Sequence, residues 1–146
     1  MAKVNIYINF NGNCEEAFNF YKSVFGGDFQ YLGRYKDVPP PDRKKFRPEN
    51  DEKIMHVSLP ISKETILMGS DNPNSTDAII VGNNISLSID TNQREEADLI
   101  FTQLSAGAKI RDQMSETFWG AYFGSLTDRF GINWLINCDI SQTTTH

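Results

Sequence analysis

Apolar and polar residues alternate along several short stretches of the chain, and this two-residue period is typical of half-buried β-strands. In residues 4–10, VNIYINF, apolar side chains alternate with asparagine and tyrosine. The same pattern predicts further strands in FQYLGRY (29–35), IMHVSLPI (54–61), ETILMG (64–69), NISLSID (84–90), AKIRDQM (108–114), WGAYFGSLTD (119–128) and INWLIN (132–137). The last two are expected to form a hairpin across the turn sequence DRFG.

A helical pattern occurs twice, at positions 80 residues apart. Residues 15–27, EEAFNFYKSVFGG, and residues 95–107, EEADLIFTQLSAG, align without a gap and share both glutamates, the alanine and the final glycine. Their apolar residues have the spacing of one helix face. We expect Asn13 and Asn92 to cap these helices, each with a glutamate three residues later in a capping box, and the glycines to end them.

The predicted order is a strand, a helix and three strands, and the chain passes through this order twice. One helix on one small sheet buries too little surface to be stable alone, so two copies are expected to share a single domain. We place the first module at about residues 3–70, a linker at 71–83 and the second module at about 84–138, and we expect a disordered tail at 139–146.

The polar, proline-rich stretch KDVPPPDRKKFRPENDEK (36–53) interrupts the first module. No regular element is predicted there, and we expect a long loop. Two interpretations stay open at this point: the loop closes over a site as a lid, or it is a tolerated insertion.

Composition and charge exclude several classes of protein. The chain of 146 residues is 39% hydrophobic and 23% charged, which is typical of a globular domain. Its net charge is −5, and its one basic cluster, RKKFR at 43–47, lies between acidic residues, so we expect no nucleic-acid partner. With no long apolar run and no leader pattern, we expect no membrane association and a cytoplasmic location. Cys14 and Cys138 are isolated and have no zinc-binding spacing.

Four segments give the chain a family resemblance that spans nearly its whole length. They are FNGNCEEAFNFYKSVFGG (10–27), IMHVSL (54–59), LMGSD (67–71) and TDRFGINWLIN (127–137). With them the chain resembles the vicinal oxygen chelate superfamily of glyoxalases, bleomycin resistance proteins and dioxygenases, and within it the PhnB-like, 3-demethylubiquinone methyltransferase-like branch. The resemblance implies an α+β fold in which two βαβββ modules form a cup-shaped mixed sheet with the helices outside. It also implies a homodimer and a small-molecule ligand inside the cup.

Enzymes of this superfamily hold a divalent metal through side chains from four strands, usually two histidines with carboxylates or a glutamine. Carried over to this chain, those positions fall at Asn5 or Ile6, His56, Asn84, and Leu135 or Trp134. His56 is the one plausible ligand among them, because leucine and tryptophan cannot coordinate a metal and asparagine is a weak donor. We therefore expect no cofactor and no tightly held metal.

Strand alternation within the implied cup predicts which side chains line it. The polar face of the strands would turn inward and bind a ligand through hydroxyl and amide groups. The expected lining consists of Asn5, Tyr7, Asn9, His56, Ser58, Asn84, Ser86, Ser88, Asn133 and, from the aromatic run FWGAYF, Trp119 and Tyr122. The same alternation would also suit a sheet face exposed to water, and the aromatic run would also suit a core or an interface between subunits.

His56 is the candidate catalytic residue, as a general acid or base near neutral pH. It could equally make only structural hydrogen bonds, since no carboxylate partner is apparent in the sequence. Three functions remain open: binding of a small polar molecule without metal, a metal-dependent lyase or dioxygenase with His56 as ligand, and a purely interacting role.

Overall fold

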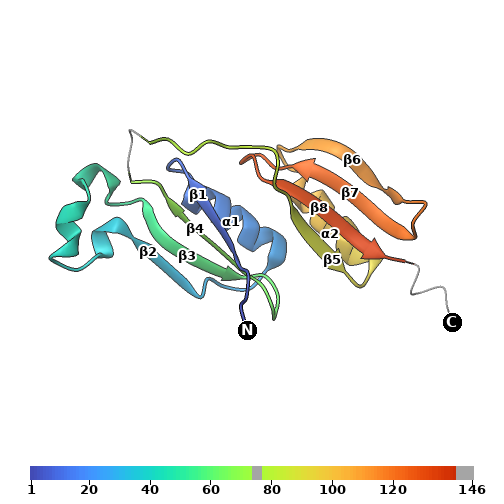
Figure 1. The fold of residues 1–146 in the computed structure, drawn as a ribbon, viewed down its shortest axis with the longest axis horizontal. Coiled ribbons are helices and arrows are strands. Elements are labelled where there is room, and N and C mark those ends of the chain that lie inside the picture. Colours follow the sequence, from blue (N-terminus) through green and yellow to red (C-terminus); the bar gives the residue numbers. More distant parts are fainter. Residues whose placement is uncertain (74–76, 141–146) are drawn as a thin grey trace. The chain divides into compact units, whose positions relative to one another are not determined.

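The computed structural model describes residues 1–73 and 77–140, and the chain divides into two compact units, Met1–Ile80 and Val81–His146. Among the described residues, each unit contains one strand, one α-helix and three further strands in that order, as predicted (Figure 1). The α+β fold with two βαβββ modules is thereby confirmed. Of the tail predicted to be disordered at 139–146, Asp139 is instead the last residue of a strand, and residues 141–146 lie outside the described residues.

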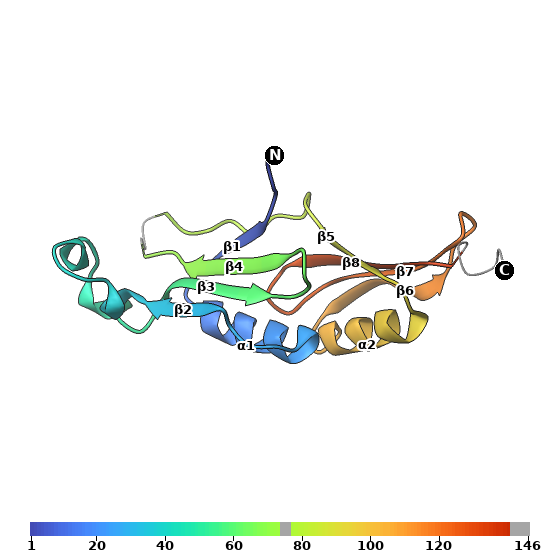
Figure 2. The ribbon, with the colours of Figure 1, turned by 90° about the horizontal axis from the view of Figure 1, so that it is seen from below.

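In the first unit, one helix covers one face of a mixed four-stranded sheet (Figure 2). The elements are β1 (Ile6–Phe10), α1 (Cys14–Phe25), β2 (Tyr31–Arg34), β3 (Ile54–Pro60) and β4 (Ile66–Asp71). The strand order is β1-β4-β3-β2, with β1 parallel to β4 and the other pairs antiparallel. Among the described residues of this unit, no α-helix covers the opposite face of the sheet (Figure 2).

The helix packs on the sheet through the apolar stripe seen in the sequence. Ala17, Phe18 and Tyr21 are fully buried, and the helix ends where Gly26 adopts a positive φ of 79°. The ring of Phe18 lies directly over Gly69 of β4, where a Cβ atom would approach the ring to 2.7 Å. A glycine at this position therefore lets the helix lie close to the sheet.

The expected capping box of α1 is absent. Asn13 is the N-cap residue, but its side chain makes no capping hydrogen bond. The start of the helix is instead bonded by Asp71, at the end of β4 and 57 residues away in the sequence. Its Oδ1 accepts a hydrogen bond from the Cys14 backbone N–H at 2.9 Å. Its Oδ2 accepts from the Ile54 N–H of β3, also at 2.9 Å. One carboxylate, only 2% exposed, thus joins the helix start to two strands.

The stretch after β2 differs from the prediction of an irregular loop, because it contains three short 3-10 helices. They are η1 (Tyr35–Asp37), η2 (Asp42–Lys45) and η3 (Pro48–Asn50). The rings of Tyr35 and Phe46 lie 4.7 Å apart, and Arg43 forms an ion pair with Asp51. The Tyr35 hydroxyl donates to the Asp71 carbonyl oxygen at 2.7 Å, so the segment is anchored on the end of β4.

In the second unit, the same arrangement recurs with β5 (Leu87–Thr91), α2 (Arg94–Leu104), β6 (Lys109–Glu116), β7 (Ala121–Thr127) and β8 (Asn133–Asp139). The strand order is β5-β8-β7-β6, with β5 parallel to β8. Its first strand begins three residues later than predicted, and Ile85, which precedes it, is 73% exposed. The N-cap residue of α2 is Gln93, so the predicted cap at Asn92 is wrong. The Gln93 side chain makes no capping hydrogen bond.

The core of the second unit centres on Trp134, which is fully buried. Its indole Nε1–H donates to Oδ2 of Asp128 at 2.8 Å. The other carboxylate oxygen, Oδ1, accepts from the backbone N–H groups of Phe130 and Ile132. The predicted DRFG turn is confirmed, and its aspartate fixes both the turn and the tryptophan.

Neither α1 nor α2, nor any other helix in residues 1–73 and 77–140, has the length and apolar composition needed to cross a membrane.

We expect Asp71→Asn to destabilise the first unit by about 1.5–3 kcal/mol, because one backbone N–H would face an amide group instead of a charged acceptor. Hydrogen exchange of peptides from α1 and β3 measures the change. Tryptophan fluorescence would not, since Trp119 and Trp134 are both in the second unit.

The matched control is Asp90→Asn, because Asp90 is exposed and accepts a hydrogen bond from the Asn137 side chain. It should change stability by no more than about 0.5 kcal/mol. Equal losses from the two substitutions would contradict the anchoring role of Asp71.

Candidate functional site

The first sheet presents a row of polar and aromatic side chains on the face that α1 does not cover. The strand registers pair Tyr7 with Met68, Met68 with Ser58, and Ser58 with Tyr31. His56, two residues before Ser58 on β3, pairs with Gly33 of β2. Alternate residues of a strand share a face, so these side chains from four strands lie on one surface.

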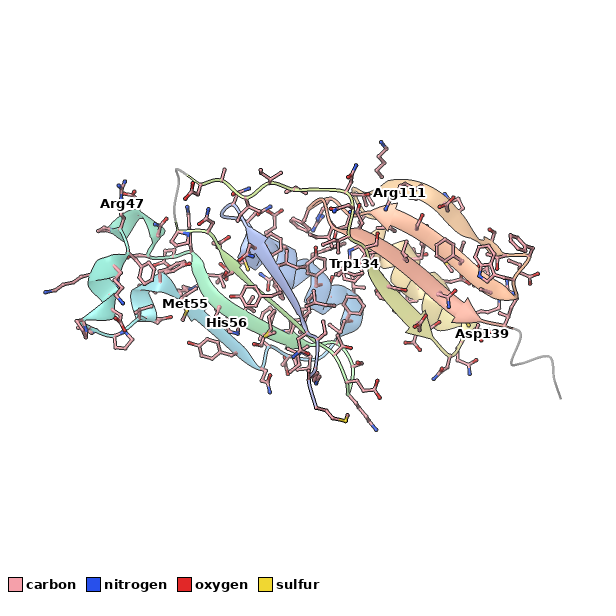
Figure 3. The ribbon with its side chains drawn as sticks, in the orientation of Figure 1. Arg47, Met55, His56, Arg111, Trp134 and Asp139 are labelled. Atoms are coloured by element: carbon pink, nitrogen blue, oxygen red, sulfur yellow. The ribbon has the colours of Figure 1, made fainter. Side chains whose placement is uncertain are left out.

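His56 lies at the centre of this surface, on β3 beside β2 (Figure 3). Its Nδ1 is 3.2 Å from the Tyr7 hydroxyl, and its Nε2 is 3.0 Å from Oγ of Ser58. Both neighbours are neutral hydroxyl groups that can donate or accept, so either imidazole tautomer satisfies the pair of contacts. Ser58 is buried, whereas Tyr7 is 45% exposed. We refer to Tyr7, Tyr31, His56 and Ser58 as the His56 face.

Tyr31 belongs to the His56 face, although the sequence analysis did not select it. It is 47% exposed, and its ring centroid lies 5.8 Å from that of His56, close to the 5.6 Å between Tyr7 and His56. Two tyrosine rings therefore flank the imidazole. A glycine two residues after Tyr31 was the feature of the sequence that could have indicated its place. A Cβ atom at Gly33 would lie 2.5 Å from the Tyr31 hydroxyl oxygen, so the glycine leaves room for the ring.

The remaining predicted residues of the first unit lie at the margin of this surface. Asn9 is on β1, and its Oδ1 accepts a hydrogen bond from Oγ of Ser70 at 3.4 Å. Asn5 is exposed and precedes β1 by one residue, so its side chain is not held by the strand pairing. The geometry around His56 is thus defined by tyrosine and serine more than by the predicted amides.

In the second unit, the predicted amide and serine residues lie on β5, in the segment before β5 and on the neighbouring strand β8. Ser88 is exposed on β5, while Asn84 and Ser86 are exposed in the segment before β5. Asn133 is buried and already bonded: its Oδ1 accepts from Thr127 at 2.8 Å and its Nδ2 donates to the Ile85 carbonyl at 3.0 Å. Its amide holds the chain before β5 in place.

Tyr122 lies on the helix side of the second sheet, and its predicted place among the lining residues of a cup is corrected here. Its hydroxyl donates to Oδ1 of Asp98 on α2 at 2.6 Å, and the Arg94 guanidinium lies 4.0 Å from its ring centroid. The hydrogen bond to Asp98, with burial as a smaller cause, raises the pKa of the tyrosine. Trp119 is exposed in the turn between β6 and β7, with its ring edge against Phe118.

Carboxylates also occupy the uncovered face of the second sheet, where the sequence analysis expected hydroxyl and amide groups. Asp112 on β6 accepts a hydrogen bond from Oγ of Ser125 at 2.7 Å, and Asp90 on β5 accepts from Asn137 at 3.2 Å. The predicted lining included only amide, hydroxyl and aromatic side chains in this unit and omitted both Asp90 and Asp112. Alternation from Ser88 would have placed Asp90 on the same face.

The residues at the positions implied for a metal do not form a suitable donor set. His56 is the one strong ligand among them, and both of its ring nitrogens are within hydrogen-bond distance of hydroxyl groups. Trp134 is buried and bonded to Asp128, and Leu135 has no donor atom. Within residues 1–73 and 77–140, no three histidine, cysteine, aspartate or glutamate side chains gather closely enough to hold an ion. Hydrogen bonding and ring stacking are the interactions that the residues of the His56 face offer to a ligand.

Two βαβββ units, each with a helix on one face of a mixed four-stranded sheet, give the chain an α+β fold of the glyoxalase/bleomycin-resistance type. The comparison with protein families makes this more specific. The chain belongs to the 3-demethylubiquinone-9 3-methyltransferase family, whose model matches residues 2–137. The resemblance drawn from the sequence segments is confirmed.

Three known proteins are similar to this chain in sequence or in fold. Protein YjdN of Escherichia coli (strain K12) is 31% identical over 144 residues, which cover 94% of this chain and 96% of that protein. The crystal structure of protein PA1353 from Pseudomonas aeruginosa has a TM-score of 0.83 at 34% identity, covering 95% of this chain and 98% of that one. A glyoxalase/bleomycin resistance protein/dioxygenase family enzyme from Burkholderia phytofirmans PsJN shares the fold, with a TM-score of 0.61 at 18% identity over 94% and 99% of the two chains.

We expect Gly33→Ala to displace the Tyr31 ring from its place beside His56, because the added methyl group would overlap the ring. The loss of stability should stay below about 1 kcal/mol, since an exposed ring can turn away into solvent. NMR spectra of the His56 ring protons test this, because a neighbouring aromatic ring shifts their resonances.

Tyr31→Ala provides the comparison for this experiment. The two variants should shift the His56 ring signals in the same direction and by similar amounts. Unchanged His56 signals in Gly33→Ala would show that the glycine does not determine the position of Tyr31.

Proposed function

We propose that this chain binds a small polar molecule at the His56 face, without a tightly held metal. The observation that carries the proposal is the imidazole of His56, set between two hydroxyl groups and two half-exposed tyrosine rings. A binding site for a small molecule typically combines apolar or aromatic walls with a few fixed polar groups, and this surface has both.

The hydrogen-bonding capacity of the face suits a ligand with neutral polar groups. A hydroxyl group offers one proton and two lone pairs, so Tyr7 keeps capacity beyond its contact with His56. Its partial exposure leaves that capacity accessible. The rings of Tyr7 and Tyr31 add flat surfaces on which a planar or ring-shaped ligand could stack. A sugar, nucleoside or phenol fits this combination better than a strongly charged ion.

The surroundings of His56 support binding without chemical conversion. A histidine acting as general base is usually oriented by a third group, most often a carboxylate that stabilises the imidazolium. Here Tyr7 and Ser58 occupy both ring nitrogens and neither carries a charge. The name of the family model refers to methyl transfer and that of one solved relative to glyoxalases and dioxygenases, but one fold hosts several activities, so a name alone assigns no reaction.

The second candidate function is a metal-dependent lyase or dioxygenase that uses His56 as a ligand. The fold shared with the enzyme from Burkholderia phytofirmans favours it, and the donor set described above opposes it. The expected homodimer and the cytoplasmic location stay predictions that rest on the resemblance and on composition.

We expect a panel of sugars, nucleosides, hydroxy acids and phenols, with bleomycin included, to contain compounds that raise the melting temperature of the protein. A ligand at 100 times its Kd stabilises the folded state by about 2.7 kcal/mol. Tyr7→Phe should weaken the affinity about tenfold, which corresponds to about 1.4 kcal/mol, because one accessible hydroxyl is lost.

The matched control is Tyr122→Phe, which removes the same hydroxyl from the helix side of the second sheet. It should change the affinity less than about twofold, well under 1 kcal/mol. The proposal fails if no compound in the panel stabilises the protein, or if both tyrosine variants weaken binding equally.

Protein purified without chelator should contain less than about a tenth of an equivalent of zinc, manganese, nickel or iron by elemental mass spectrometry. The reason is that a structural or catalytic site needs three or four strong ligands. One full equivalent that is lost in His56→Ala would instead establish the metal-dependent alternative.

A further inference from the structure

The first unit contains a cavity of about 550 Å³ beside the 3-10 helices, at the ends of β1 and β4. Six of its lining residues carry the argument below: Lys45, Phe46, Arg47, Glu49, Asn50 and Lys53. None of the four residues of the His56 face lines it. Figure 3 shows the same separation, with Arg47 on the segment between η2 and η3 and His56 on β3. The volume is in the range of small-molecule sites.

The charge of the lining is positive. Three cationic side chains and one carboxylate face the cavity. Lys45 is paired with Asp42 at 2.9 Å and Arg47 with Glu49 at 3.6 Å, and both pairs are largely exposed to solvent. Exposed ion pairs of this kind are weak, so their cations remain able to attract an anion.

Lys53 is the cation that no carboxylate of the described residues neutralises through an ion pair. Its side chain is half-buried and runs past Gly12, where an added Cβ atom would lie 3.7 Å from Cε and 3.8 Å from Nζ. The backbone on either side of it is fixed, because Lys53 N–H donates to the Asn50 carbonyl and its own carbonyl accepts from Tyr35. A half-buried ammonium group in a cavity is a strong attractor for an anion.

The remaining wall is rigid and partly apolar. The Phe46 ring packs against Tyr35 at 4.7 Å, and Tyr35 is itself bonded to the end of β4. Asn50 is buried, and its amide donates to the Pro73 carbonyl at 3.0 Å. These contacts hold the segment from η2 to η3 in one position, so the cations need little reorganisation when a ligand binds.

We propose that this cavity is a second binding site, which takes the phosphate or carboxylate group of a small molecule. Lys53 contacts the anionic group, Arg47 and Lys45 supply further positive charge, and Phe46 packs against the apolar part of the ligand. The site is separate from the His56 face and does not depend on the function proposed there.

Isothermal titration calorimetry with phenyl phosphate, inorganic phosphate, benzoate and phenol tests the proposal on the full chain. We expect phenyl phosphate to bind more tightly than inorganic phosphate, because Phe46 adds apolar contact, and we expect Lys53→Gln to leave any binding of neutral phenol unchanged, because phenol has no anionic group for Lys53. Comparison of phenyl phosphate with benzoate decides which anionic group is preferred. Binding should weaken as the salt concentration rises.

Lys53→Gln should weaken the binding of the better anion at least tenfold. Lys44→Gln is the matched control, because Lys44 is exposed on η2, belongs to the same basic cluster and does not line the cavity. It should change affinity less than twofold. Unchanged circular dichroism and melting temperature of both variants would exclude unfolding as the cause, and Arg47→Gln, at an exposed position, gives a second test with an expected loss of several fold.

Three results would overturn the proposal. The first is that no anion binds to the wild-type protein. The second is that Lys44→Gln weakens binding as much as Lys53→Gln, which would indicate attraction by net charge alone. The third is that Tyr7→Phe, and not Lys53→Gln, abolishes binding, which would place the anion at the His56 face.

Discussion

The carboxylate of Asp71 is the contact on which the first unit depends. It accepts hydrogen bonds from the first N–H of α1 and from the start of β3, while its backbone carbonyl receives the Tyr35 hydroxyl. The helix, the central strands and the 3-10 segment are therefore positioned by one residue. The buried carboxylate also acts on its neighbours: burial, followed by its charge, raises the pKa of Tyr35 to about 12, and the same two causes raise the pKa of the Cys14 thiol.

The two units share their apolar packing but differ in the buried polar residues that fix their strands and helices. In the first sheet, Phe10 pairs with Asp71, whereas in the second sheet the corresponding pair is Thr91 with Cys138. The second unit thus has a thiol where the first has its anchoring carboxylate. Its own buried carboxylate, Asp128, lies in the β7–β8 turn and holds Trp134. Both units reach the same topology because their apolar periodicities agree, while the polar groups that fix each end have diverged.

The spacing of apolar and polar residues was sufficient to predict the strands and the buried face of α1. Alternation located every strand and correctly placed His56 and Ser58 opposite Val57, and the spacing of α1 identified its buried stripe. The errors involve contacts between residues distant in sequence. Asn13 was expected to cap α1, but Asp71, 57 positions away, bonds the helix start. Tyr122 was predicted on the wrong face of the sheet. Its face is determined by the pairing of β7 with β8 and by the hydrogen bond from its hydroxyl group to α2, and a local sequence pattern shows neither. The 3-10 helices likewise depend on Tyr35 and Phe46 meeting across ten residues of polar sequence.

The first unit has neutral hydrogen-bonding groups at the His56 face and positively charged groups in the cavity around Lys53. At the His56 face, hydroxyl groups surround the imidazole, and because they donate or accept equally well, the face can match the donors and acceptors of a neutral ligand. A carboxylate in their place would favour the charged imidazole and fix one tautomer. The positive charge that an anionic ligand requires is found instead around Lys53, in the cavity formed by the segment that interrupts the repeat. A segment of 3-10 helices, held by aromatic packing and ion pairs, thus gives the first βαβββ module a surface that the second lacks. In the second unit, α2 and the strands follow one another with no comparable segment among the described residues.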